Sequence, residues 1–166
     1  MELTVKERLF LINQYRILQH LSGKEDAEHY KHACQILEAG YTNEYGSFVD
    51  MFSELPLNGC DEVVDILDMH RHLNDAFESL ADKSGINASL VKFGGFDGNN
   101  EGRHMSYATF LIKDQGKWQE FKHIDLNSHH TTLARYREML KEWKRSAYPQ
   151  TLTKDDVLRI INVQVS

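Results

Sequence analysis

The sequence has few cysteines and no long apolar run. Only two cysteines, Cys34 and Cys60, occur among its 166 residues, and their spacing matches neither a disulfide framework nor a metal knuckle. Lys6 and Arg8 precede an apolar run that ends after residues 9–12. A signal peptide needs about 7–15 apolar residues and a membrane helix about 20. We therefore predict a cytoplasmic protein with reduced thiols and no membrane contact.

Sequence motifs of the common enzyme classes are missing as well. The sequence contains no GxSxG, GxxxxGK(S/T), GxGxxG, HExxH or CxxC pattern. It therefore offers no nucleophile elbow, nucleotide-binding loop, zinc-protease helix or redox pair. Carboxylates are abundant, but no pair of them stands in a context that marks a general acid and base. We expect no cofactor and no metal, and an enzyme is the less favoured interpretation.

Positive charge is also in short supply. The 19 Lys and Arg residues face 25 Asp and Glu, so the formal net charge is -6, which provides no general attraction to phosphate backbones. Arg137, Lys141 and Lys144 lie at i, i+4 and i+7 of a predicted late helix, with Arg145 beside them. This row could bind phosphate, but the net charge favours a solvent-exposed helix side. Nucleic acid is thus an unlikely partner and only a third possibility.

The chain has the length and composition of one globular domain. A chain of 166 residues can bury about 70% of its unfolded surface without disulfides or metal. Its composition, 41% hydrophobic and 27% charged, is that of an ordinary soluble globular protein. We predict that residues 1–166 form a single helical domain.

The longest unbroken periodicity runs over residues 58–82. In one series, Val63, His70 and Phe77 recur every seven residues. In a second series, Ile66, Leu73 and Leu80 each follow three residues later. This stripe predicts a long central helix, capped at its start by Asn58, that buries one side. Shorter helices on either side of it in the chain are predicted to cover that stripe. The segment 90–93 is the one candidate strand.

Three helices are predicted before the central one, the third of them a short one that carries Phe48, Val49 and Phe52. Thr4 with Glu7, and Ser22 with Glu25, have the spacing of capping boxes. The second of these helices is expected to stop at Gly40, because glycine favours the left-handed conformation that ends helices. The first helix carries apolar residues on more than one side. We therefore expect it to pack between other elements or between subunits.

The stretch from residue 93 to residue 102, FGGFDGNNEG, is the one that packing alone does not explain. Its glycines allow positive φ angles and close backbone approach, and its polar oxygens gather at the start of a helix. We therefore predict a small-ligand site at Gly95, Phe96, Asp97, Asn99, Asn100, Glu101 and Arg103. The structural alternative is that the Asp and Asn side chains shape the turn and cap the helix. Calcium is not expected, because the twelfth position of an EF-hand register is Ala108.

Histidines raise the question of a metal site. One group lies within a short segment: His123, Asp125, His129 and His130. This His123–His130 group could supply metal ligands from one loop. A metal-dependent hydrolase that uses either this group or the Asp97–Glu101 loop therefore stays an alternative. Neither matches an established ligand spacing, so solvated side chains are favoured. His70 lies on the apolar stripe and is expected to be a buried, hydrogen-bonded neutral imidazole.

Several short motifs are spread over nearly the whole chain. They are Glu7-Arg-Leu, Asn13-Gln-Tyr15, Leu37-Glu-Ala-Gly-Tyr41, Val64-Asp-Ile-Leu-Asp-Met69, Gly95-Phe-Asp-Gly-Asn-Asn-Glu101, Tyr136-Arg-Glu-Met-Leu140 and Leu158-Arg-Ile-Ile161. Together they resemble the YfbU family of bacterial proteins. The resemblance implies a mostly helical, oligomeric fold. It also implies a ligand-binding or regulatory module, since some family members carry an added DNA-binding segment, and it transfers no catalytic residue.

We accordingly predict a mainly all-α, multihelical fold organised around the central helix, with at most one or two very short strands. The favoured function is a non-enzymatic ligand-binding or regulatory module that self-associates into a homo-oligomer. The alternative is the metal-dependent hydrolase, or another enzyme, built on the loop or on the histidine group.

Overall fold

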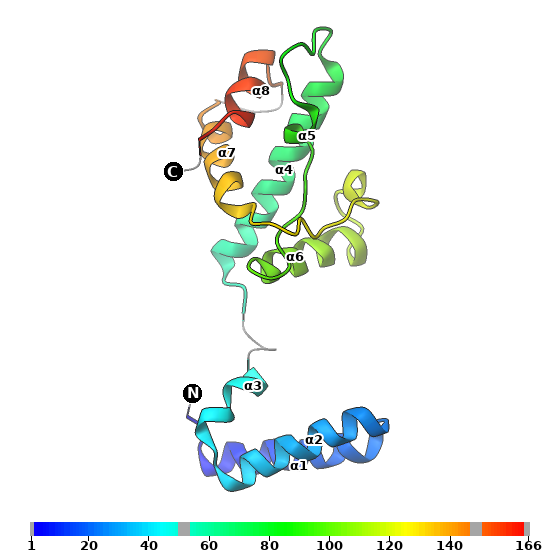
Figure 1. Cartoon of the computed structure of the whole chain (residues 1–166), viewed down its shortest axis with the longest axis vertical. Coiled ribbons are helices and arrows are strands. Elements are labelled where there is room, and N and C mark those ends of the chain that lie inside the picture. The colour runs from blue at the N-terminus through cyan, green and yellow to red at the C-terminus, as the bar shows by residue number, and fades with distance from the viewer. Residues whose placement is uncertain (1, 50–53, 147–150, 165–166) are drawn as a thin grey trace. The chain divides into compact units, whose positions relative to one another are not determined.

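The computed structural model describes residues 2–49, 54–146 and 151–164. The chain divides into two compact units, Met1–Glu54 and Leu55–Ser166, each with its own hydrophobic core (Figure 1). Across the described ranges, strand-like pairing is limited to one isolated parallel bridge between Phe96 and Asn127. The all-α fold expected from the sequence is confirmed. The assignment of the whole chain to one domain stays a prediction.

The N-terminal unit is built on two helices that pack side by side (Figure 1). Its elements are α1 (Val5–Leu21), α2 (Lys24–Ala39), the short 3-10 helix η1 (Thr42–Glu44) and α3 (Gly46–Val49). The predicted capping box opens α1: the N–H of Thr4 donates to the carboxylate of Glu7 at 2.7 Å, and the N–H of Glu7 donates to the hydroxyl of Thr4 at 3.3 Å. Gly40 ends α2 in the left-handed conformation, with φ +73°, as predicted.

The predicted capping box at Ser22 and Glu25 is wrong. Ser22 directly follows the last residue of α1, and its N–H donates to the carbonyl of Leu18 at 3.0 Å. Because Ser22 closes the first helix, Gly23 becomes the N-cap of α2 and no side chain caps that helix. The two helices are therefore joined by a very tight turn.

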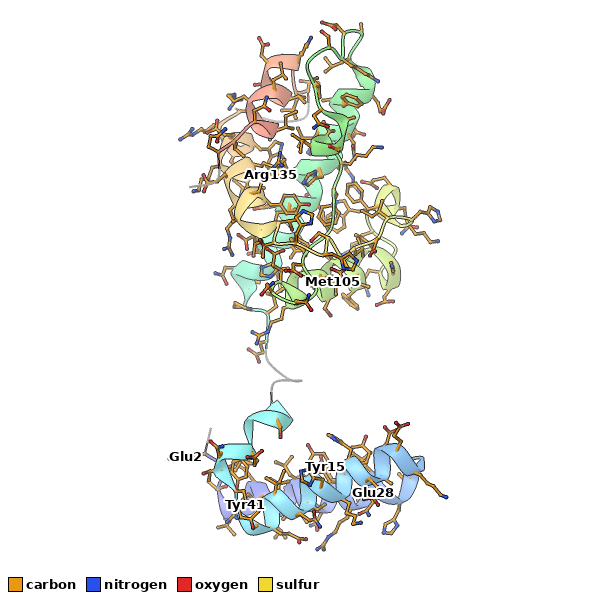
Figure 2. The ribbon with its side chains drawn as sticks, in the orientation of Figure 1. Glu2, Tyr15, Glu28, Tyr41, Met105 and Arg135 are labelled. Carbon is orange, nitrogen blue, oxygen red and sulfur yellow. The ribbon has the colours of Figure 1, made fainter. Side chains whose placement is uncertain are left out.

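The C-terminal unit is built around the long helix that the sequence predicts. Its elements are α4 (Leu57–Ser79), α5 (Ala88–Val91), α6 (Gly102–Thr109), the π-helical turn η3 (Phe110–Asp114), the 3-10 helix η4 (Gln119–Phe121), α7 (Leu133–Arg145) and α8 (Lys154–Ile161). In Figure 1, α7 and α8 lie along one side of α4, and α6 crosses near its N-terminal half. Arg135, labelled in Figure 2, joins α7 to α8 by donating to the carbonyl of Ile161 at 2.8 Å.

The apolar stripe of α4 faces the core, as its spacing predicts. The fully buried side chains of the helix include Val63, Ile66, Leu67, Met69, His70 and Leu73. The helix ends earlier than expected, since Leu80 is already its C-cap. The predicted cap at Asn58 is wrong: Pro56 is the N-cap and Asn58 lies inside the helix. Proline suits this entry because it has a fixed φ and no N–H to satisfy.

The segment 90–93 is not a strand. Its first two residues belong to α5, which begins where the side chain of Asn87 accepts a hydrogen bond from the N–H of Ser89 at 3.0 Å. A local cap therefore outweighs the β-propensity of the apolar residues. Extended pairing appears only after the glycines, at Phe96.

Candidate functional site

Two stretches of backbone that are distant in sequence meet at the predicted ligand loop. The N–H of Phe96 donates to the carbonyl of Leu126, and the N–H of Ser128 donates to the carbonyl of Phe96, both at 3.0 Å. Gly95 has φ +83°, and a Cβ atom on it would lie 2.3 Å from the carbonyl oxygen of Leu126. The close approach of two backbones therefore accounts for this glycine.

Glu101 is the centre of the hydrogen bonding in this loop. Its Oε1 accepts from the N–H groups of Thr132 and Leu133 at 2.9 and 2.8 Å. Its Oε2 accepts from the N–H of Asp97 at 2.9 Å and lies 3.0 Å from the hydroxyl of Thr132. The residue is only 7% exposed. Glu101 thus caps the N-terminus of α7 from a distant part of the chain, where a negative charge also complements the helix dipole.

Asp97 is equally committed to the loop itself. Its carboxylate accepts from the side-chain amide of Asn100 at 2.5 Å and from the N–H of Asn99 at 3.0 Å. The amide of Asn100, together with this N–H, lowers the pKa of Asp97 because both stabilise the charged form. The backbone N–H of Gly98, which directly follows Asp97 in the chain, donates to the side-chain oxygen of Asn127 at 3.1 Å. Each carboxylate oxygen of Asp97 therefore already accepts one hydrogen bond from within the loop.

The structure divides the seven predicted ligand residues into two sets. Gly95, Phe96, Asp97 and Glu101 are buried, whereas Asn99, Asn100 and Arg103 are exposed. Of the structural alternative, the turn is present, because Asp97 accepts from the N–H of Asn99. The predicted cap by Asp or Asn is wrong: no side chain caps α6, and Glu101 instead caps the distant α7. Ligand binding at this loop stays a prediction, and a ligand from solvent would meet the exposed set.

Sequence analysis missed Thr132 and Asn127, the partners of the loop. Thr132 directly precedes the first residue of α7, where a capping threonine is common, so this position did carry a local signal. The acceptor that it meets, Glu101, lies 31 residues earlier in the chain. No local pattern indicates such a distant partner.

A second polar cluster ties three helices together beside the loop. Glu62 of α4 accepts from Nε and Nη2 of Arg137 at 2.7 and 2.9 Å, and Nε2 of His104 lies 3.3 Å from it. The two-point contact with Arg137 lowers the pKa of Glu62. The ring of His104 also lies 5.7 Å from that of Phe96. The cluster therefore joins α4, α6 and α7 around the buried part of the loop.

The basic row predicted on α7 is paired with acidic side chains. The pairs are Arg137 with Glu62, Lys141 with Glu138, Lys144 with Asp65, and Arg145 with Glu142. Two of these link α7 to α4 and two lie within α7. A phosphate group would have to compete with these carboxylates for the cations.

The histidine group is open to solvent. Nε2 of His129 lies 3.7 Å from Oδ2 of Asp125, and both side chains are exposed. Among the residues that the structure describes, no three His, Cys, Asp or Glu side chains gather in a way that could hold a metal ion. The alternative of a metal-dependent hydrolase therefore gains no metal centre from the His123–His130 group or from the Asp97–Glu101 loop.

His70 is buried, as expected, but only one of its two ring nitrogens is hydrogen-bonded: Nε2 is buried with no partner among the described residues. Its Nδ1 lies 2.8 Å from the carbonyl of Val91, so this nitrogen carries the proton of the neutral ring. Its ring meets that of Tyr136 edge-on at 4.9 Å. Burial lowers the pKa of His70 to about 4; the bond to Val91 opposes this shift and the charge of Arg135 adds to it.

Acidification is expected to destabilise the C-terminal unit through His70. Between pH 6.5 and pH 4 the unfolded chain binds a proton that the folded one does not, so stability falls with falling pH over this window and is unaffected above it. The loss should reach about 3 kcal/mol at pH 4. Urea unfolding followed by tryptophan fluorescence at several pH values measures it. A His70→Phe variant should show a shallower pH dependence, and an unchanged slope contradicts the assignment.

These contacts define an all-helical protein whose most unusual loop caps one of its own helices. The YfbU domain model matches residues 1–163, and the chain belongs to the YfbU family. It is also 28% identical to a UPF0304 protein of Actinobacillus succinogenes over 164 residues, which cover 98% of this chain and 99% of that protein. Within the described ranges, no helix combines the length and apolar character needed to cross a membrane.

Proposed function

We propose that this protein is a non-enzymatic helical module of the ligand-binding or regulatory type, and that it self-associates through α1. The surface concerned, the outer face of α1, consists of Phe10, Gln14, Ile17 and Leu21. At 3.6 residues per turn these four residues fall within an arc of about 60°. The observation that carries the proposal is the exposure of the three apolar members of this face.

α1 carries apolar residues around most of its circumference, including the exposed Val5, Leu9 and Leu18, and only the side at Ile12 packs within its unit. Ile12 is buried against α2, whereas Phe10, Ile17 and Leu21 are 69%, 59% and 78% exposed. The outer face lies about 170° round the helix from Ile12. Single exposed apolar residues are ordinary, but an aligned set of this size marks an interaction surface.

The core of the N-terminal unit is small. Its buried residues are Ile12, Ala33, Cys34, Ile36, Leu37 and Tyr45, and the rings of Tyr15 (Figure 2) and Tyr30 stack beside them at 5.8 Å. Units below about 70–80 residues rarely obtain more than about 3–5 kcal/mol from a single core. Covering the outer face of α1 would add apolar burial that this unit lacks.

The polar groups of the C-terminal unit support a non-enzymatic role. The carboxylates of Asp97 and Glu101 already accept hydrogen bonds from the chain's own amides, which makes them poor candidates for acid and base. A ligand-binding role would use the exposed side chains of Asn99, Asn100 and Arg103. Both cysteines carry free thiols, in keeping with a reducing compartment such as the cytoplasm.

Light scattering after size-exclusion chromatography tests the association. From about 10 to 200 μM, we expect the mass of the full chain to rise from 19.3 kDa towards twice that value. Ile17→Glu should keep the mass of one chain throughout, because pairing would bury its charge. Gln35→Glu, on the exposed side of α2, is the matched control and should behave like the unmodified protein. A constant mass of 19.3 kDa for the unmodified chain refutes the proposal.

A further inference from the structure

We draw no further inference here: the strongest candidate, the buried His70 side chain where α4 meets α5 and α7, carries nothing beyond the acid sensitivity already described for it.

Discussion

Replacing Gly95 with alanine is expected to lower the free energy of unfolding of the C-terminal unit by roughly 2–5 kcal/mol, from left-handed backbone strain and overpacking together. The residue has φ +83°, and an added Cβ would meet the carbonyl oxygen and carbon of Leu126 at 2.3 and 2.5 Å. Both atoms are backbone and cannot rotate away. The clash can be relieved only if the backbone at Phe96 separates from that of Leu126 and Ser128. This pairing also positions the loop that caps α7.

The fluorescence of the two tryptophans reports this effect selectively. Trp118 and Trp143 both lie in the buried core of the C-terminal unit, so urea unfolding followed by their emission measures that unit. Gly85→Ala is the matched control, because Gly85 has φ +77° but an added Cβ there would meet nothing within 4 Å. It should show only the conformational cost, about 1–2 kcal/mol. Equal losses in the two variants would contradict the role of the close backbone contact.

The helices were predictable where the pattern that forms them is local. Seven-residue spacing located α4 because burial on one side of a helix repeats with the helical turn. The capping box of Thr4 with Glu7 and the stop at Gly40 were predictable for the same reason. Ser22 was misassigned because the end of α1 competes for the same residue, and this depends on where the preceding helix stops.

The unusual composition of the loop was visible in the sequence, but its structural role was not. Gly95 indicated close backbone approach, and the structure identifies the approaching backbone as that of Leu126. Glu101 was predicted as one of the polar groups of a ligand site, and its partners Thr132 and Leu133 lie more than 30 residues away. Distant contacts of this kind follow from the packing of α6 and α7 against α4, which no local pattern determines. The apolar character of α1 on more than one side was predictable, and the packing of Ile12 within its unit accounts for one of those sides.

Replacing Glu101 with alanine is expected to destabilise the C-terminal unit by roughly 3–5 kcal/mol, because it leaves several buried donors without their acceptor. The N–H groups of Asp97, Thr132 and Leu133 all donate to this carboxylate. Glu101→Gln should lose less, because its remaining carbonyl oxygen can still accept while its NH2 group cannot. Urea unfolding gives the free energies, and hydrogen exchange should show faster exchange of the Thr132 and Leu133 amides in Glu101→Ala.

Glu138→Ala is the control for the loss of a carboxylate, because Glu138 pairs with Lys141 on the surface of α7 and should cost less than about 1 kcal/mol. If Glu101→Ala is as stable as this control, then water or neighbouring groups satisfy the amides of Thr132 and Leu133. Glu101 would then not be needed for capping, and its carboxylate would again be a candidate ligand group. A large loss with faster exchange confined to the start of α7 instead identifies the glycine and carboxylate loop as a structural cap. Recognition of a ligand at this loop is then expected on its exposed side, at Asn99 and Asn100.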